Sequence, residues 1–523
     1  MSLHLTFYDG VDCIGGNKIL LEADGSKLFF DFGTNFKAEG TFFDEFLCPR
    51  VVLGLGDPLA LGLLPPLKGL YRPDLEYPGV WERFAESPLY RDAVVQGVLL
   101  SHAHLDHCGY ISYLHRDIPV LCSLTTALTC KAMQDTSSGN RLQEICYINP
   151  REFTDGLLKT GNYRRVFHEQ RPYVVFAPTT VSGPAVLFWE QCHNSRGLNC
   201  RPFESFIHET RVGDLTVRYW PVDHSIPGAG AFGVRTSAGW VVYTGDLRIH
   251  GRQASLTKRF IAEAAGLGPV VLVCEGTHPL NGTPVTEAEV LANSFEAVRG
   301  ADGLVVADFG PRNVERLLSF LEIAAETGRR LALTPKDAYL LEGLCAAGEP
   351  GVPDPYVDER VVLYVKPKGT LFAWEKALLE RFSVYCPERM VDAKTVRGDQ
   401  SGFILCFSYY DFHALLDINP YGGTYIYSSS EAFDEEMLID HERVRNWINY
   451  FGFKLCGSLG KDREKSGFHA SGHIHGAGLE ELVETINPDI LVPVHTQDRE
   501  FFRQFEGRRK VLLPRRGETV AID

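Results

Sequence analysis

Three histidines and one aspartate lie close together directly behind an apolar stretch of the chain. They are His102, His104, Asp106 and His107, and the stretch Val94–Leu100 predicts a buried strand. Alternate residues leaving a strand point the same way, so the first two histidines can share one metal ion while the following turn carries the other two residues to a second. Nitrogen and oxygen ligands without thiolates favour zinc, with manganese as an alternative. A histidine-rich solvated loop or a satisfied core cluster is the competing interpretation.

Four further residues of ligand type each follow a short apolar run in the same way. This pattern predicts side chains at the carboxyl ends of strands, where α/β and sandwich folds collect their active sites. The recurrence argues against the solvated loop. The four residues and the runs before them are His224 after Leu215–Val222, Asp246 after Trp240–Thr244, Glu275 after Val270–Cys274, and His495 after Ile490–Val494.

In these residues the sequence resembles the metallo-β-lactamase superfamily and, within it, the β-CASP nucleases. The likeness rests on the His-x-His-x-Asp-His motif at 102–107, on His224 and on Asp246 in Thr-Gly-Asp, in the family's chain order. The resemblance implies two metal ions, and it assigns the ligands as follows: His102, His104 and His224 hold one zinc ion, Asp106, His107 and His495 hold the other, and Asp246 bridges both.

The three additional β-CASP motifs are also present, as Glu275 in Cys-Glu-Gly-Thr, His473 in Ser-Gly-His and His495 in Pro-Val-His. A histidine at the third motif is typical of family members that process RNA. The resemblance implies that His473 protonates the leaving 3′ oxygen while Glu275 holds its imidazole, and that Asp106 or Asp246 orients the attacking hydroxide. His469 and Ser471 would bind a neighbouring phosphate, with local turn capping as the alternative.

Among β-CASP proteins the sequence is most similar to ribonuclease J, over most of the chain. The likeness lies in Gly15–Lys18, Phe30–Gly33 and His469–His473. Three features depart from that family: the residues after the second and third β-CASP histidines differ, the segment between His107 and His224 is longer, and we expect its C-terminal domain to be absent. Fine substrate preference is therefore open.

Three classes of function follow from these motifs. The leading prediction is a metal-dependent ribonuclease that hydrolyses phosphodiester bonds as a 5′-to-3′ exonuclease, an endonuclease or both. The second is a hydrolase of DNA or of a small phosphodiester on the same metal core. The third is a non-catalytic RNA-binding paralogue, which the complete set of metal ligands disfavours.

The predicted fold is α/β, with a metallo-β-lactamase αββα sandwich and an inserted α/β β-CASP domain. We expect the sandwich in residues 1–284 and 436–523 and the insertion in 285–435. Within the insertion, helical and strand patterns alternate as Val285–Arg299, Gly303–Ala307, Asn313–Thr327 and Arg330–Leu333. The chain is then expected to return to the sandwich through Glu442–Phe451 and the strand Asp489–Val494.

Composition agrees with a large enzyme, since 45% of the 523 residues are hydrophobic and 23% are charged. With no run of about eighteen apolar residues and no leader pattern, we expect a cytoplasmic protein without a membrane span. Thirteen cysteines without a Cys-x-x-Cys pair indicate reduced thiols. Packing is the expected role of Cys108, beside His107. The leucine-rich segment Leu59–Leu70 is expected to pack on its own domain, with a partner surface as the alternative.

The net charge of −15 excludes a general electrostatic grip on nucleic acid, so any positive charge at an RNA site must be local. Basic residues near the C-terminus are candidates for a basic groove, although flanks of a last strand at Lys510–Leu513 are the favoured interpretation. An RNA substrate is expected, and a homodimer is left open. The basic candidates are Arg503, Arg508, Arg509, Lys510, Arg515 and Arg516.

Overall fold

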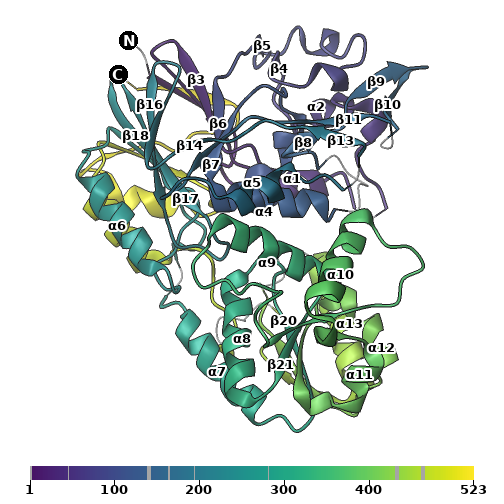
Figure 1. The fold of residues 1–523 in the computed structure, drawn as a ribbon. Coiled ribbons are helices and arrows are strands. Elements are labelled where there is room, and N and C mark those ends of the chain that lie inside the picture. The colour runs from purple at the N-terminus through teal and green to yellow at the C-terminus, as the bar shows by residue number, and fades with distance from the viewer. Residues whose placement is uncertain are drawn as a thin grey trace.

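Three large sheets dominate the computed structural model of this chain (Figure 1). It describes residues 3–44, 46–137, 143–162, 165–193, 195–280, 282–429, 435–460 and 466–522, with the side chains of 435 and 436 excepted. Two sheets face each other in the upper part of Figure 1, and the third lies below them within its own set of helices.

The first sheet contains eight strands, and β1 and β2 pair antiparallel with Leu5 opposite Leu21. Its order is β14 (Glu204–Phe206), β12 (Tyr173–Phe176), β7 (Val120–Ser123), β6 (Gly97–Leu99), β3 (Ser26–Phe30), β2 (Lys18–Ala23), β1 (Leu3–Asp9) and β29 (Glu518–Ile522). The second contains seven, in the order β15 (Glu209–Val212), β16 (Leu215–Pro221), β17 (Gly230–Thr236), β18 (Gly239–Tyr243), β19 (Val271–Glu275), β27 (Ile490–Val494) and β28 (Lys510–Val511).

The two sheets form a sandwich because alternate residues along their strands are apolar and meet in one buried core. Leu5 and Phe7 of β1 share this core with Val217 of β16 and Val273 of β19. Helices α4 (Leu124–Asp135) and α5 (Gly183–Glu190) lie on the outer side of the first sheet, and α6 (Ala254–Ala265) and α14 (Gly476–Ile486) on that of the second. The predicted αββα arrangement is thereby confirmed.

The third sheet is entirely parallel, which requires helical crossovers between its strands. Its order is β23 (Met390–Val391), β22 (Val361–Tyr364), β21 (Arg330–Leu333), β24 (Phe403–Cys406), β20 (Leu304–Asp308), β25 (Gly423–Tyr427) and β26 (Phe453–Cys456). The helices around it are α7 (Glu287–Arg299), α8 (Val314–Thr327), α9 (Pro335–Ala347), α10 (Ala373–Tyr385), α11 (Ala393–Gly398), α12 (His413–Ile418) and α13 (Glu435–Phe451). The predicted alternation of helix and strand after residue 285 is confirmed.

The expected return of the chain through Glu442–Phe451 is wrong. Val444, Ile448 and Phe451 recur on one face of α13 and bury themselves in the core of the third sheet, and the strand that follows, β26, pairs with β25 of that sheet. The chain therefore leaves the third sheet only after Cys456, beyond the predicted limit at residue 435. The domain limits otherwise stay a prediction.

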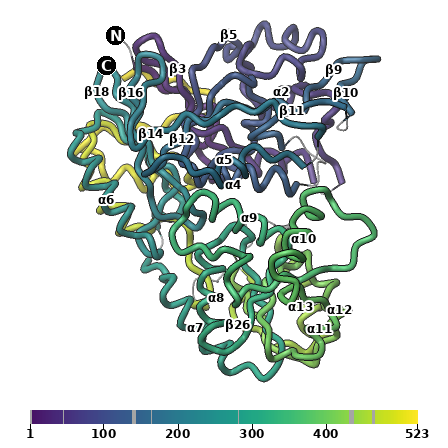
Figure 2. The backbone as a smooth tube through the Cα atoms, viewed as in Figure 1, coloured from purple at the N-terminus to yellow at the C-terminus, as the bar shows by residue number. Residues whose placement is uncertain are grey.

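The two parts of the molecule contact each other through helices α4 and α9. The first and last strands, β1 and β29, pair along their length, so the chain ends lie side by side (Figure 2). The remaining elements are α1 (Phe36–Gly40), α2 (Gly56–Ala60), α3 (Leu105–Cys108), β4 (Leu67–Lys68), β5 (Arg91–Asp92), β8 (Tyr147–Ile148), β9 (Arg151–Thr154), β10 (Leu157–Thr160), β11 (Phe167–Gln170) and β13 (Gly197–Asn199), with short 3-10 turns between them.

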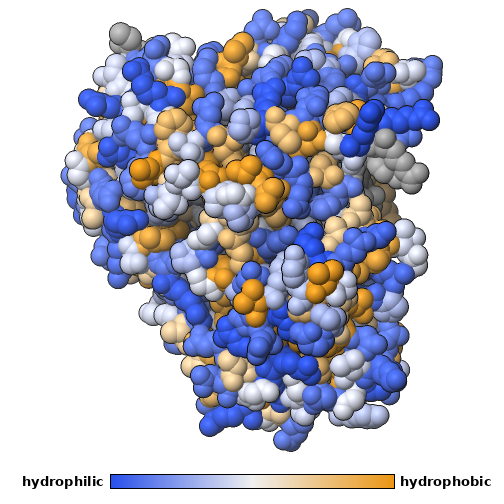
Figure 3. All heavy atoms as spheres, in the orientation of Figure 1, coloured by the Kyte–Doolittle hydropathy of each residue, from blue (hydrophilic) through white to orange (hydrophobic). Residues whose placement is uncertain are grey.

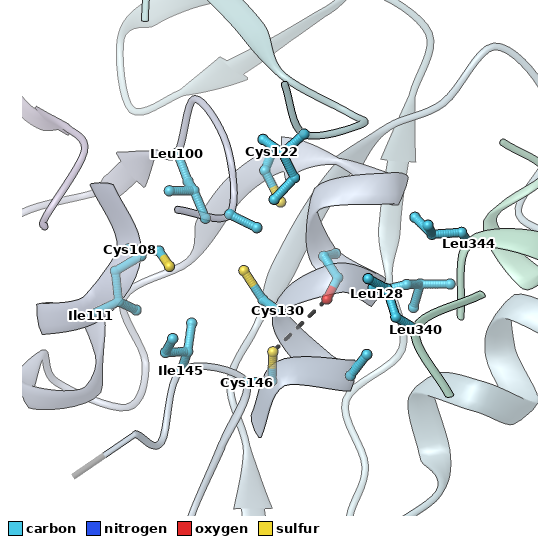
Figure 4. Close-up of a cluster of buried hydrophobic side chains, with 14 of the residues drawn as sticks. Leu100, Cys108, Ile111, Cys122, Leu128, Cys130, Ile145, Cys146, Leu340 and Leu344 are labelled. Carbon is cyan, nitrogen blue, oxygen red and sulfur yellow. Dashed lines mark hydrogen bonds between the residues drawn. The ribbon is translucent and has the colours of Figure 1, made fainter. Parts of the chain in front are cut away.

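Two predictions about apolar residues are confirmed. Leu59, Leu64 and Leu70 are buried in the core beside the first sheet, so the leucine-rich segment packs on its own domain. Cys108 is fully buried among apolar side chains that include Leu100, near three other buried thiols (Figure 4). The face drawn in Figure 3 is mostly hydrophilic, with apolar residues in small groups. Across the described ranges, every helix is too short or too polar to cross a bilayer.

Candidate active site

Three of the predicted site residues lie at one edge of the second sheet. Strands β18, β19 and β27 are neighbours and run parallel, so their carboxyl ends meet. Asp246 follows β18, Glu275 is the last residue of β19, and His495 follows β27. The backbone of His495 has a φ of 53°, a left-handed conformation that is strained for a side chain of this size and turns the chain sharply where the ring enters the site.

The segment 101–108 brings the other ligands from the first sheet. It leaves β6 as extended chain and ends in α3, so Asp106 and His107 lie on one short helix rather than on a turn. The peptide of Asp106 packs tightly against the loop after β3, where a Cβ on Gly33 would lie 1.6 Å from the carbonyl oxygen of Asp106. Only glycine allows this approach. A backbone hydrogen bond of 2.9 Å from Gly230 to Ser101 ties the segment to the second sheet.

Three histidine nitrogens converge in the first candidate metal position. Nε2 of His102 lies 3.0 Å from Nδ1 of His104, and Nε2 of His224 lies 3.2 Å from the same atom. Two nitrogen ligands of a tetrahedral zinc ion are separated by roughly 3.4 Å, so the three rings fit one shared ion. Nδ1 of His224 lies 2.6 Å from the carbonyl oxygen of Gly472, which fixes the ring with Nε2 directed inward.

A second group forms around two carboxylates. Nε2 of His495 lies 3.3 Å from Oδ2 of Asp106, and Nε2 of His107 lies 3.7 Å from the same oxygen. Oδ2 of Asp246 lies 3.0 Å from His107, 3.6 Å from His495 and 3.6 Å from His102, so it stands between the two groups. Oδ1 of Asp246 is buried and accepts no hydrogen bond within the described parts of the chain. The donor set therefore fits two adjacent divalent metals.

Electrostatics keep His102, His224 and both carboxylates in the protonation states that bind metal. His107 differs: burial alone would lower its pKa, but the carboxylates of Asp246 and Asp106 more than offset it and raise the pKa above the usual value, so this ring must lose a proton when a metal binds. Burial lowers the pKa of His102 and His224 well below the usual value, so both rings are neutral. Burial alone would raise the pKa of Asp246, but the nearby rings of His107 and His495 more than offset it, and the pKa is lowered well below its usual range. Asp106 is likewise held ionised, chiefly by His107 against the cost of burial. Neutral imidazoles and ionised carboxylates are what a divalent metal requires.

Glu275 and His473 form a pair beside the second group. Nδ1 of His473 lies 3.0 Å from Oε2 of Glu275, which is almost fully buried. Burial alone would lower the pKa of His473, but the carboxylates of Glu275 and Asp246 more than offset it and raise the pKa to about 9. The imidazole is then protonated at neutral pH and its proton is available to a leaving group.

The predicted phosphate ligands line the cavity in front of these groups. Its volume is about 380 Å³, and His469, Ser471 and His473 line it together with His104 and His224. The two phosphate candidates therefore lie beside the converging histidines, and their role stays a prediction. His475 lies behind them, buried, with its ring centroid 5.2 Å from that of His278 and 5.4 Å from that of His250.

Two functional residues were not assigned a role from the sequence. Oδ2 of Asp31 lies 2.7 Å from Nδ1 of His107 and accepts hydrogen bonds from Ser101 and Tyr243. The hydroxyl of Thr277 lies 2.9 Å from Nδ1 of His495 and donates to Oε2 of Glu275 at 3.1 Å. Both hold the outer nitrogen of a candidate ligand, which sets the tautomer and orientation of the ring. Asp31 lies in Phe30–Gly33 and Thr277 in Cys-Glu-Gly-Thr, and their position in these motifs is the sequence signal that could have identified them.

The basic residues near the C-terminus are mostly neutralised by carboxylates. Arg503 pairs with Glu500 and Glu506, whereas Arg508 and Arg509 share Glu484. The only strand in this stretch is β28, which includes Lys510, and Arg516 pairs with Asp9. The structure therefore favours charged flanks over a basic groove; the predicted last strand is shorter than expected, and β29 follows it.

Comparison with known proteins finds ribonuclease J from several bacteria. Ribonuclease J from Mycobacterium tuberculosis (strain ATCC 25618 / H37Rv) is 32% identical over 129 residues, covering 24% of this chain and 23% of that protein. Ribonuclease J from Sinorhizobium meliloti is 26% identical over 417 residues, covering 77% of this chain and 57% of that protein. Ribonuclease J from Corynebacterium glutamicum is 24% identical over 447 residues, covering 82% and 50%. The matches thus span between 23% and 57% of these relatives' own length.

A solved structure shares the fold. The crystal structure of a protein of unknown function from Enterococcus faecalis V583 superimposes with a TM-score of 0.66 at 21% sequence identity, over 100% of both chains. No protein-family model matches the chain.

Proposed function

We infer the activity of this chain from its place in the ribonuclease J-like metallo-β-lactamase/β-CASP family: it is a metal-dependent hydrolase of phosphodiester bonds in RNA. The observation that carries the inference is the convergence of all seven candidate ligands beside a protonated histidine. Six come from three separated segments of the chain and the seventh, Asp246, stands between the two groups. A paralogue that only bound RNA would have no need of this arrangement.

We propose that two zinc ions, or manganese in their place, are the resident metals. His102, His104 and His224 would hold one, Asp106, His107 and His495 the other, and Asp246 both. When bound, such a pair lowers the pKa of a water molecule and offsets charge on the phosphate oxygens. Asp106 and Asp246 add the negative charge that retains the ions, and the surrounding core excludes bulk water.

In the proposed reaction His473 is the general acid. Its Nδ1 faces Glu275, so the proton on Nε2 can be given to the leaving 3′ oxygen. Glu275 keeps the ring protonated and fixes its orientation. His469 and Ser471 would hold a phosphate of the bound strand in the same cavity. The same proposal takes the third sheet and its helices as the β-CASP cap of this site. It also includes a homodimer and a cytoplasmic location.

The test is an RNA panel with purified protein loaded with zinc or with manganese. Matched 5′-monophosphate, 5′-hydroxyl and circular RNAs of one sequence are compared with single-stranded DNA. Metal-dependent cleavage of RNA, fastest on the 5′-monophosphate form, is the expected result and indicates 5′-to-3′ exonuclease action. Rapid cleavage of the circle would make the enzyme an endonuclease. Equal cleavage of DNA would overturn the RNA assignment, and no cleavage with either metal would overturn the activity itself.

A further inference from the structure

Arg312 stands at the mouth of the candidate active site with an unmatched positive charge. It belongs to the loop between β20 and α8 and is half-buried. Its guanidinium contacts the sulfur of Met133, with Nη1 3.7 Å from Sδ, and it makes no ion pair among the described residues. Other half-buried arginines of the insertion do have carboxylate partners, such as Arg381 with Glu342 at 2.7 Å. A largely desolvated cation without a counter-ion costs free energy, so its retention calls for an anion.

The surroundings of Arg312 show where that anion would lie. Arg312 lines the cavity of about 380 Å³ that contains His104, His224 and His473. It also lines a second cavity of about 280 Å³, bounded by Met133, Gln134 and Lys336, between α4 and α9. Arg312 is thus common to the wall of the reacting site and to the wall of a neighbouring cavity.

Apart from Arg312, the charge of this molecule does not favour binding of a polyanion. The chain carries a net charge of −15, and the basic residues near its C-terminus are mostly paired with carboxylates. Lys336 lines the second cavity as its other described cation, beside the carboxylate of Asp337. Among the described residues that line the two cavities, Arg312 is the cation that both walls share, and its planar guanidinium can grip a phosphate through two parallel hydrogen bonds.

We propose that Arg312 binds the phosphate adjacent to the one being hydrolysed and thereby directs a single strand from the reacting site into the cavity between α4 and α9. The proposal rests on the proposed function of the site, and it adds a residue outside the family-like motifs that selects a polymeric substrate over a small phosphodiester. A small phosphodiester needs only the first cavity, whereas a strand needs both.

The test combines binding and turnover with Arg312→Gln and Arg312→Lys. Fluorescence anisotropy with a non-hydrolysable single-stranded oligonucleotide is measured across a salt series, and turnover is measured on RNA and on bis(p-nitrophenyl) phosphate. Loss of one charge-assisted phosphate contact should weaken oligonucleotide binding by roughly ten- to a hundredfold. It should also reduce the slope of log K against log salt by about 0.7. Hydrolysis of the small ester should fall much less than cleavage of RNA, because this ester has no second phosphate for Arg312 to bind.

Arg312→Lys should restore the salt slope, because it keeps the charge, but only part of the affinity, because it loses the fork geometry. Arg299→Gln is the matched control, since this exposed arginine at the end of α7 pairs with Glu296 and its replacement removes the same charge elsewhere on the insertion. An unchanged affinity and slope in Arg312→Gln would overturn the proposal while leaving the ribonuclease assignment standing. Failure of the wild-type protein to bind the oligonucleotide or to cleave RNA would instead overturn the proposed function.

Discussion

Glu287 holds the inserted unit to the active-site loop, and replacing it with glutamine should be strongly destabilising. The carboxylate is 2% exposed, at the start of α7. It accepts hydrogen bonds from Arg248 at 3.0 Å and from Arg316 at 2.8 Å and 3.3 Å, and both arginines are fully buried. Arg248 also donates to the carbonyl of Ser471. Glu287→Gln leaves two buried cations without this counter-charge and points an amide N–H at one of them.

Two independent arguments give the same loss in the free energy of unfolding for Glu287→Gln. Burial alone would raise the pKa of Glu287, but Arg316 and Arg248 more than offset it and lower the pKa from 4.5 to about 2. At about 1.4 kcal/mol for each pH unit, that drop is worth about 3 kcal/mol at neutral pH. Removal of one partner from a buried ion pair costs about 3 to 5 kcal/mol in proteins generally. We therefore expect the free energy of unfolding to fall by about 3 kcal/mol at pH 7.

The stabilisation by Glu287 should change with pH in one direction. Because the folded pKa is depressed, the stabilisation by Glu287 is complete above pH 4.5 and is lost as the pH falls from there towards 2. By pH 4 the difference between wild type and Glu287→Gln should have shrunk by about 0.8 kcal/mol. Urea unfolding of the metal-loaded proteins at pH 7 and pH 4 measures both quantities.

Glu296→Gln serves as the matched control for Glu287→Gln. Glu296 lies on the same helix, is exposed and, among the residues that the structure describes, pairs with Arg299 alone. Its replacement should change the free energy of unfolding by less than about 0.5 kcal/mol. A loss below about 1 kcal/mol for Glu287→Gln at pH 7, or a loss that is the same at both pH values, would refute the assignment of a charge-dependent clamp.

Four substitutions test the division of labour within the site. Asp246→Asn should lower the content of both metals together, as measured by elemental analysis, and loss of one equivalent alone would contradict its position between the groups. His473→Ala should keep both metals and lower RNA cleavage by about 10² to 10⁴, whereas His495→Ala should lose metal as well; equal metal content in the two variants would refute their separate roles. Thr277→Val removes the hydroxyl that contacts His495 and should weaken metal affinity or activity by about 10- to 100-fold, so an unchanged metal titration and rate would show that the hydroxyl is dispensable.

The convergence of the candidate ligands could be predicted because it depends on strand ends. A short apolar run followed by a polar residue is visible in the sequence, and β18, β19 and β27 then turn three such positions into neighbours. Asp31 illustrates what this reasoning misses. It directly follows β3, which pairs with β6, so its contacts with Ser101 and His107 can be inferred only once the strand order is known.

The predicted end of the inserted unit at residue 435 was wrong for a related reason. The expected path of return, Glu442–Phe451, lies within the helix α13, and Val444, Ile448 and Phe451 form its buried apolar face. Spacing shows which face of a helix is apolar but not which sheet receives it. The parallel pairing of β25 with β26 decides that question, and it joins segments that the sequence shows only as separate short runs.

Buried ion pairs are the feature that sequence patterns reveal least. In this molecule they connect the sandwich with the inserted unit. Arg248 follows the metal-site residue Asp246, whereas Glu287 and Arg316 belong to α7 and α8 of the insertion. Arg248 donates to the carbonyl of Ser471 and Arg316 to that of Phe468, on the loop that leads to His473. Each arginine therefore binds both a carboxylate of the insertion and the backbone of the catalytic loop. The orientation of His473, the proposed general acid, depends on the insertion being docked, so a displacement of α7 or α8 would be felt at His473 and, through the carbonyl of Gly472, at the ring of His224.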